Sequence, residues 1–183
     1  MKLIGLAGWS GAGKTTLLSR LIPHWTAQGL RVSTIKHAHH NFDVDTPGKD
    51  SWVHRQSGAT EVLVSSGRRW ALMHELRGDV EPQMMELLGK LTRVDLVVVE
   101  GYKTAIYPKL EIHRAANGKA LLFPDDPTIC GIATDAAVTT DLPVAGINDI
   151  AAIAAIMEAA AIPVEECAAF AERFAAAVAT AGE

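Results

Sequence analysis

A glycine-rich segment near the start of the chain constrains its fold and chemistry more than any other feature. Residues 8 to 15 read Gly-Trp-Ser-Gly-Ala-Gly-Lys-Thr and match the pattern G-x-x-x-x-G-K-[ST] of a phosphate-binding P-loop. In this pattern the glycines let the backbone curl so that its N–H groups face phosphate oxygens. Lys14 supplies a cation for the β- and γ-phosphates, and Thr15 supplies a hydroxyl for Mg²⁺. The segment therefore predicts a nucleotide-binding loop.

The sequence on either side of this loop has the order that such a site requires. Residues 2–7 form a short apolar run typical of a buried strand, and residues 16–22 carry leucines at helical spacing. Strand, loop and helix in this order place phosphates at a helix N-terminus, where unpaired N–H groups and the helix dipole favour anions. The predicted nucleotide-binding residues are Gly11, Ala12, Gly13, Lys14, Thr15 and Thr16.

A second predicted strand ends in a carboxylate. Residues 94–99 are a nearly continuous apolar run, and Glu100 follows them. A buried strand with an acidic end is the Walker B-like partner of a P-loop, so Glu100 is a candidate to bind Mg²⁺ or to orient an attacking water. Asp95 begins the same strand and, at about 3.3 Å per residue, lies too far from that end to share the metal. The other interpretation of Glu100 is a solvated residue at a strand end.

The polar segment 37–49 is the other candidate for chemistry. Within it, Asp45 is a candidate for the metal or its water ligands, as in switch loops. With Lys14 and Glu100 it completes the predicted catalytic set. Three histidines also fall here, which allows a metal-site interpretation beside that of a solvated loop. They are His37, His39 and His40.

The remaining pattern predicts one α/β domain that spans residues 1–183. Apolar strands alternate with helices, which favours a mostly parallel central sheet flanked by helices, as in the P-loop NTPase fold, with a β-hairpin in mid-chain. A length of 183 residues, 49% of them hydrophobic, suits a single core. Further strands are predicted at 31–36, 109–113 and 129–133, a hairpin at 60–76, and helices at 50–56, 81–91, 149–161 and 164–179.

Charge and cysteine content limit the classes of partner and the cellular compartment that we expect for this protein. The formal net charge is −4 and no long basic run occurs, so we expect no nucleic-acid binding. The two cysteines, Cys130 and Cys167, are far apart, which predicts neither a disulfide framework nor a cysteine zinc site. No uninterrupted apolar stretch is long enough to cross a membrane. We therefore expect a cytoplasmic protein that does not enter a membrane.

Several of these segments together resemble the MobB family of molybdopterin-guanine dinucleotide biosynthesis adaptor proteins. The resemblance lies within residues 1–115. Its most specific part reads His-His-Asn-Phe-Asp-Val-Asp-Thr-Pro-Gly-Lys-Asp-Ser, because general phosphate chemistry does not require that order. The matching segments are 8–16, 39–51, 54–59 and 95–103.

The resemblance implies a GTP-binding protein with weak, Mg²⁺-dependent GTPase activity. Its implied partner is the guanylyltransferase that attaches GMP to molybdopterin, with molybdopterin itself as a further candidate ligand. It implies that the loop residues hold phosphate, with Asp45 and Glu100 near Mg²⁺. It also implies a homodimer that forms through the hairpin at 60–76.

The residues alone give a weaker prediction of which base the bound nucleotide carries. The guanine signature N-K-x-D is absent in that form. Asp135 follows the predicted strand at 129–133 and is the candidate to accept hydrogen bonds from guanine, with Asn148 and Asp149 as alternatives.

Two other functions fit the same loop. One is a small-molecule kinase in which Asp45 is the base, although residues 101–150 offer only Arg114 for an arginine-bearing lid. The other is a metallochaperone GTPase that binds metal through the three histidines. Fast hydrolysis needs an arginine finger, and Arg55, Arg68 and Arg69 are its candidate sources. We expect slow hydrolysis and favour a nucleotide-gated adaptor.

Overall fold

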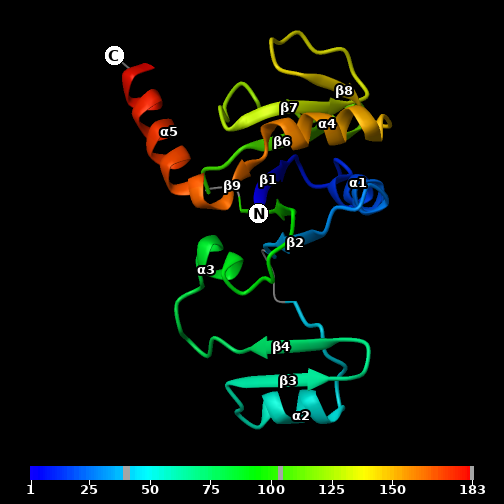
Figure 1. Cartoon of the computed structure of the whole chain (residues 1–183), viewed down its shortest axis with the longest axis vertical. Coiled ribbons are helices and arrows are strands. Elements are labelled where there is room, and N and C mark those ends of the chain that lie inside the picture. The colour runs from blue at the N-terminus through cyan, green and yellow to red at the C-terminus, as the bar shows by residue number, and fades with distance from the viewer. Residues whose placement is uncertain (39–41, 103–104, 182–183) are drawn as a thin grey trace. The chain divides into compact units, whose positions relative to one another are not determined.

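The computed structural model describes residues 1–38, 42–102 and 105–181. The chain forms two compact units (Figure 1). The first, here the sheet unit, comprises Met1–His37 and Leu88–Glu183. The second, here the hairpin unit, is Ala38–Leu87, which the sequence inserts between two strands of the sheet unit. In the part of the chain that the structure describes, no helix is both long and apolar enough to cross a bilayer.

The sheet unit is built on a seven-stranded sheet with strand order β2-β5-β1-β6-β7-β8. The pairs along this order are parallel, and β9 pairs antiparallel with β1. The strands are β1 Lys2–Ala7, β2 Val32–Lys36, β5 Leu96–Glu100, β6 Lys109–His113, β7 Ile129–Thr134, β8 Val144–Gly146 and β9 Ile162–Pro163. The helices are α1 Lys14–Ala27, α4 Ile150–Ala160 and α5 Cys167–Ala181, with 3₁₀ turns at Ala115–Asn117 and Val164–Glu166.

One face of the sheet is covered by α1 and α4, which pack against each other. Ile4 and Leu6 of β1 join the core on this face, because alternate residues of a strand point to the same side. Trp25 of α1 is fully buried, and its Nε1 donates a hydrogen bond of 2.8 Å to Oε1 of Glu158 in α4. This bond satisfies the one polar atom of a large buried ring and fastens the two helices together.

The middle of β1 contains a glycine because an aromatic ring fills the space beside it. A β-carbon added at Gly5 would lie 2.2 Å from Cε2 of Tyr107, so a larger residue would force the ring or the strand to move. Tyr107 is 1% exposed, and burial raises the pKa of its hydroxyl well above the usual value. The hydroxyl donates to the carbonyl oxygen of Tyr102 at 3.2 Å. Gly5 thus lets a buried ring lie directly against the strand that leads into the glycine loop.

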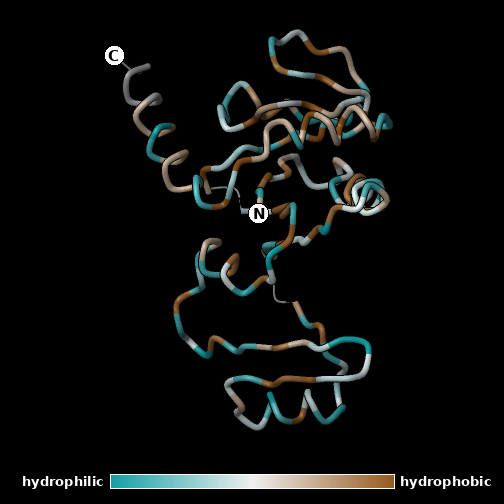
Figure 2. The backbone as a smooth tube through the Cα atoms, viewed as in Figure 1, coloured by the Kyte–Doolittle hydropathy of each residue, from teal (hydrophilic) through white to brown (hydrophobic). Residues whose placement is uncertain are grey.

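The hairpin unit contains a short helix and a two-stranded antiparallel sheet. Its elements are α2 Asp50–Gln56, β3 Glu61–Ser65 and β4 Trp70–His74, and α3 Met84–Leu88 begins at its end. Helix α2 packs against β3, where Val62 is buried. Leu63 lies opposite Leu72 in the register, and both side chains are exposed. Figure 2 shows the apolar character of β3 along much of its length.

The predicted fold class is confirmed, and the bounds predicted for α2 and β6 coincide with those observed. Helix α3 is shorter than the predicted 81–91. Pro82 lacks an N–H and Gly89 disfavours helix, so the sequence itself limits this helix at both ends. Strands β8 and β9 were not predicted, because two or three residues carry too little periodicity to recognise.

Candidate functional site

The glycine loop, residues 8–15, connects β1 to α1 in the sheet unit. Gly8, Gly11 and Gly13 have φ angles of 143°, 83° and 97°, which residues with a side chain rarely adopt. A β-carbon at Gly8 would also lie 2.6 Å from the carbonyl oxygen of Ile112, so this glycine is required by space as well as by conformation. The loop therefore depends on its glycines in the way the sequence pattern predicts.

Helix α1 begins at Lys14, and Gly13 is its cap residue. Among the described residues, no side chain accepts a cap hydrogen bond there. The Lys14 ammonium lies over the loop and donates to the carbonyl oxygens of Gly8 at 2.7 Å and Trp9 at 3.1 Å. The first turn of α1 thus presents N–H groups and a cation together, which suits an anionic ligand.

Among the other residues of the motif, Ala12 is buried in the core, whereas Thr15 and Thr16 are exposed to solvent. Ala12 is 2% exposed and belongs to the core, and its N–H donates to the carbonyl oxygen of Trp9 at 3.1 Å. Ala12 therefore anchors the loop to the sheet unit. Thr15 and Thr16 are exposed in the first turn of α1. Their hydroxyls lie where the pattern requires a metal ligand and its neighbour.

Glu100 ends β5 at the same edge of the sheet as the glycine loop. The register places it between Leu6 of β1 and Lys36 of β2, and it is half-buried. The chain then turns sharply, because Gly101 has a φ of 101° and a β-carbon there would lie 2.7 Å from the carbonyl oxygen of His37. The register therefore places Glu100 beside the strand that enters the glycine loop.

Asp95 lies at the opposite end of β5, as expected from its spacing. Its Oδ2 accepts a hydrogen bond of 2.8 Å from the backbone N–H of Arg31, which is the main reason that its pKa falls below the usual range. Asp95 therefore fastens the start of β5 to the residue that precedes β2 and takes no part in the site.

A segment that sequence reasoning missed forms a wall beside the loop. This wall segment, residues 112–117, comprises the end of β6 and the turn after it, and it lies close to each of the three glycines. Besides the contact of Ile112 at Gly8, Asn117 Oδ1 would lie 3.2 Å from a β-carbon at Gly11, and Arg114 Nε 3.1 Å from one at Gly13. Asn117 Nδ2 also donates to the carbonyl oxygen of Ser10 at 3.0 Å. The only sequence signal for this wall is its place after a strand of the sheet.

Asp135 follows β7 and contacts the same wall. Its Oδ1 accepts from the N–H of Ala115 at 2.8 Å, and its Oδ2 lies 4.0 Å from Nη1 of Arg114. Asn148 and Asp149, the two alternative candidates for guanine binding, form hydrogen bonds in other parts of the fold. Asn148 Oδ1 accepts from Arg20 at 3.1 Å, and Asp149 caps α4 by accepting from Ala152 N at 3.0 Å.

The loop's tryptophan is tied to the connection that follows the wall segment. Trp9 Nε1 donates to the carbonyl oxygen of Ala120 at 2.8 Å, and the Lys119 ammonium lies 5.8 Å from the centre of the ring. Glu111 of β6 is 1% exposed and accepts hydrogen bonds from the N–H groups of Leu122 and Phe123. A buried carboxylate thus fixes the connection that holds one side of the glycine loop.

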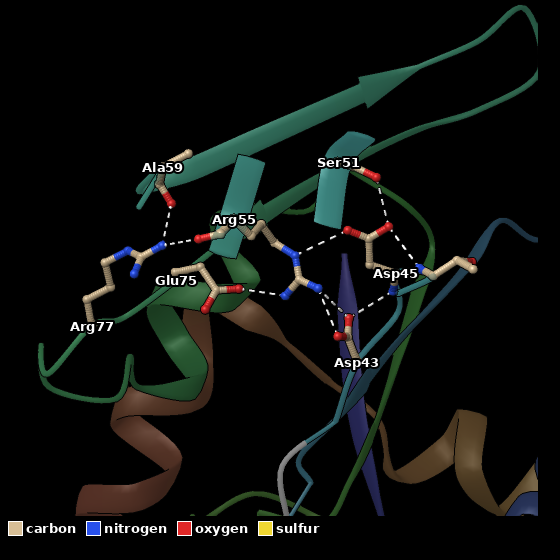
Figure 3. A network of polar contacts seen from close by, with 8 residues as sticks. Asp43, Asp45, Ser51, Arg55, Ala59, Glu75 and Arg77 are labelled. Atoms are coloured by element: carbon tan, nitrogen blue, oxygen red, sulfur yellow. Dashed lines mark hydrogen bonds and ion pairs between the residues drawn. The ribbon is translucent and has the colours of Figure 1, made fainter. Parts of the chain in front are cut away.

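The hairpin unit gathers three carboxylates around one arginine (Figure 3). Arg55 has a side chain that is 10% exposed. It donates to both oxygens of Asp43 at 2.8 Å, to Oδ2 of Asp45 at 3.2 Å and to Oε1 of Glu75 at 2.8 Å. These bonds raise the pKa of the guanidinium, that of Glu75 most of all. Arg55, a candidate arginine finger from its sequence context, therefore binds within its own unit.

Asp45 uses both carboxylate oxygens inside this cluster. Oδ1 accepts from Ser51 Oγ at 2.8 Å and from Thr46 N at 2.9 Å, while Oδ2 accepts from Arg55. Desolvation alone would raise the pKa of Asp45, but the hydrogen bonds, that of Ser51 foremost, lower it. Its carboxylate is therefore held ionised and in one orientation by residues of the 43–55 segment.

Two of the three histidines that were predicted as possible metal ligands cannot be placed. His39 and His40 lie outside the described residues. His37 contacts Tyr102, with ring centres 4.7 Å apart. Within residues 1–38, 42–102 and 105–181, no three His, Cys, Asp or Glu side chains gather in a way that suits a metal ion.

The parallel sheet, the glycine loop between β1 and α1, and the acidic end of β5 define a P-loop NTPase fold of the α/β class. A family model described as "Molybdopterin guanine dinucleotide synthesis protein B" matches residues 3–135. The chain therefore belongs to this family, MobB.

Relatives and solved structures agree with this assignment. A "Molybdopterin-guanine dinucleotide biosynthesis adapter protein" of Haemophilus influenzae is 41% identical over 157 residues, which cover 85% of this chain and 87% of that protein. The protein of the same name from Escherichia coli K12 is 39% identical, with 83% and 89% covered. A crystal structure of molybdopterin-guanine biosynthesis protein B has a TM-score of 0.68 at 21% identity, covering 86% of this chain and 98% of that one. The Bacillus subtilis MobB structure has a TM-score of 0.65 at 20% identity, and both show the same fold.

Proposed function

We infer that this protein binds GTP with Mg²⁺ at the glycine loop and serves as an adaptor for the enzyme that attaches GMP to molybdopterin. The adaptor role is supported by the names of the relatives, which match more than four fifths of the chain. The nucleotide role is supported by one observation above all. The Lys14 ammonium and the uncapped first turn of α1 face the same glycine loop.

The residues present suit a magnesium nucleotide. Lys14 would neutralise phosphate charge, and the Thr15 hydroxyl and Glu100 would hold Mg²⁺ directly or through water. A metal-binding role for Asp45 is proposed from the sequence and the family resemblance alone. Within its own unit, this carboxylate accepts hydrogen bonds from Ser51, Thr46 and Arg55.

The proposed GTPase activity is weak. Bound Mg²⁺ would polarise the phosphate oxygens, while Glu100 would orient a water molecule. An arginine finger typically accelerates such reactions by a factor of about 10³ or more. Arg55 already binds three carboxylates and would have to give these up to act as one. We therefore expect nucleotide binding, more than turnover, to control the adaptor.

Asp135 is proposed as the residue that selects guanine. It alone of the three candidates contacts the wall beside the glycine loop, whereas Asn148 and Asp149 bind Arg20 and the start of α4. An aspartate that accepts two hydrogen bonds from a base discriminates against adenine, which presents a different donor pattern.

The proposed assembly is a cytoplasmic homodimer that forms through the hairpin at 60–76. Leu63, Trp70 and Leu72 lie on one face of that hairpin, and the exposed fractions of their side chains are 62%, 66% and 47%. A two-stranded sheet also has two edges with which another strand can pair. Apolar side chains beside open edges are typical of a surface that binds a second copy.

Nucleotide competition tests the proposal directly. A fluorescent GTP analogue would be bound with Mg²⁺ and displaced by GTP or ATP, with and without the guanylyltransferase. We expect GTP to displace it far better than ATP, co-elution of the two proteins in size-exclusion chromatography, and loss of binding in Lys14→Ala but not in the exposed Lys90→Ala control. Equal competition by ATP, or phosphate transfer that depends on an added acceptor, would favour a kinase instead.

A further inference from the structure

Arg114 lies directly against the last glycine of the loop. A β-carbon added at Gly13 would be 3.1 Å from Nε of Arg114 and 3.5 Å from Nη2. The Nε–Nη2 edge of the guanidinium is the one turned to the loop, while Nη1 lies 4.0 Å from Asp135. An edge with two parallel N–H donors matches two oxygens of a phosphate.

The backbone around Arg114 is fastened on both sides. The N–H of Ala115 donates to Asp135 at 2.8 Å, and Asn117 donates to the carbonyl oxygen of Ser10 at 3.0 Å. Arg114 thus extends from a segment that is bonded to the loop itself and to the end of β7. A side chain held in this way needs little reordering to bind a ligand at the loop.

A purely structural ion pair accounts poorly for this arrangement. The Arg114–Asp135 distance of 4.0 Å is long, and about a third of each side chain is exposed, so the pair contributes little to stability. The guanidinium lies beside Gly13, the residue that precedes the first turn of α1. A cation there adds to the attraction that this turn already has for an anion.

We propose that Arg114 binds the α- and β-phosphates of the nucleotide. The proposal rests on the nucleotide site inferred above and adds a residue from outside its motif. The N–H groups of a P-loop surround the α- and β-phosphates, whereas the P-loop lysine reaches the β- and γ-phosphates. Since Arg114 lies at Gly13, it contacts phosphates that GTP and GDP share. Its loss therefore weakens the binding of both nucleotides.

Titration calorimetry with Mg·GTP and Mg·GDP tests this assignment. In Arg114→Ala we expect both dissociation constants to rise by the same factor, about tenfold or more, because a charge-assisted bidentate contact is lost. Arg114→Lys keeps the charge and recovers part of the affinity. Arg93→Ala is the matched control, since Arg93 is exposed and pairs with Glu165 at 3.5 Å. We expect this variant to bind both nucleotides with wild-type affinity.

A second readout separates ligand contact from a structural effect. If Arg114 binds phosphate, GDP affinity in Arg114→Ala depends less on salt concentration, because one screened charge pair is gone. A melting temperature close to that of wild type, by circular dichroism, shows that the fold is kept.

Three outcomes would overturn the proposal. These are wild-type affinity of Arg114→Ala for both nucleotides, loss of GTP affinity alone, and an unchanged salt dependence. Loss of GTP affinity alone, with a lower kcat, would place Arg114 at the γ-phosphate instead. If wild type itself binds neither nucleotide, the nucleotide site is wrong; if wild type binds and Lys14→Ala does not, the failure concerns Arg114 alone.

Discussion

Glu100, the last residue of β5, lies opposite Leu6 of β1 in the parallel register, two residues before the first glycine of the loop. The relationship is fixed by backbone hydrogen bonds between two neighbouring strands in the interior of the sheet. The register therefore fixes the backbone of Glu100 relative to the strand that leads into the glycine loop.

Replacing Glu100 by Gln tests its proposed role at the metal. The amide keeps the shape but removes the charge, so we expect the Mg²⁺ concentration needed for GTP binding to rise by about 10- to 100-fold. The measurement is a Mg²⁺ titration of GTP affinity. Glu158→Gln, which changes a carboxylate elsewhere in the same unit, is the control. An unchanged Mg²⁺ requirement would return Glu100 to the role of a strand-end residue.

The Arg55 cluster predicts that the hairpin unit loses stability in acid. Hydrogen bonds from Arg55 foremost lower the pKa of Asp43 below its ordinary value of 3.8, and the pKa of Asp45 is lowered as well. The unfolded chain therefore binds more protons as the pH falls, so this stabilisation is complete above pH 3.8 and is lost as the pH falls through the lower folded values. Hydrogen exchange of α2 amides at a series of pH values measures it.

Arg55→Met is the matched variant for this pH dependence. Removing the guanidinium leaves Asp43, Asp45 and Glu75 close together without their shared cation, so we expect faster exchange throughout the hairpin unit at neutral pH and a weaker dependence on acid. Arg68→Met in the exposed hairpin turn is the control and behaves as wild type. An acid response that persists in Arg55→Met would mean that other groups cause it.

Gly5→Ala tests the close approach of Tyr107 to β1. The added methyl would lie 2.2 Å from the ring, so the ring or the strand must move, and we expect a loss of about 1–3 kcal/mol in the free energy of unfolding. Urea unfolding measures this. Gly146→Ala in β8 is the control, because nothing lies within 4 Å of the added carbon. Equal stability of the two variants would show that Tyr107 leaves more room than its position indicates.

Leu72→Glu tests the proposed dimer. A charge on the exposed face of the hairpin, opposite Leu63, is costly to bury between two copies, so we expect sedimentation velocity to show a monomer where wild type is a dimer. Val80→Glu is the control, since Val80 is 91% exposed and lies outside the hairpin. A dimer that survives Leu72→Glu would place the interface elsewhere.

The sequence predicted well what depends on local patterns. The glycine loop, the apolar strand before it and the acidic end of β5 each carry their signal within ten residues, and all three lie where the prediction placed them. The hairpin at 60–76 was likewise recognisable from two β-like runs around a Ser-Gly-Arg turn.

What the sequence did not predict depends on contacts between distant segments. Arg114 lies 101 positions after Gly13 and was noted only as a lone arginine, because nothing in a linear sequence shows that β6 ends beside the loop. The cluster of Arg55 with Glu75 was missed for the same reason. Glu75, at the end of the hairpin, accepts a hydrogen bond from Arg55 in α2, which lies twenty residues earlier in the chain. Such juxtapositions follow from strand order and register, which single-sequence patterns do not contain.

The position of β1 in the centre of the sheet bears on how this protein is made. Its two parallel neighbours are β5 and β6, which begin at residues 96 and 109. During synthesis from the N-terminus, the strand that leads into the glycine loop therefore has neither parallel partner until β5 has been made. Such long-range pairing is slow and leaves apolar strands exposed in the meantime. The glycine loop therefore leaves the ribosome before the two strands that flank β1 and acquires its binding shape only after both have been made.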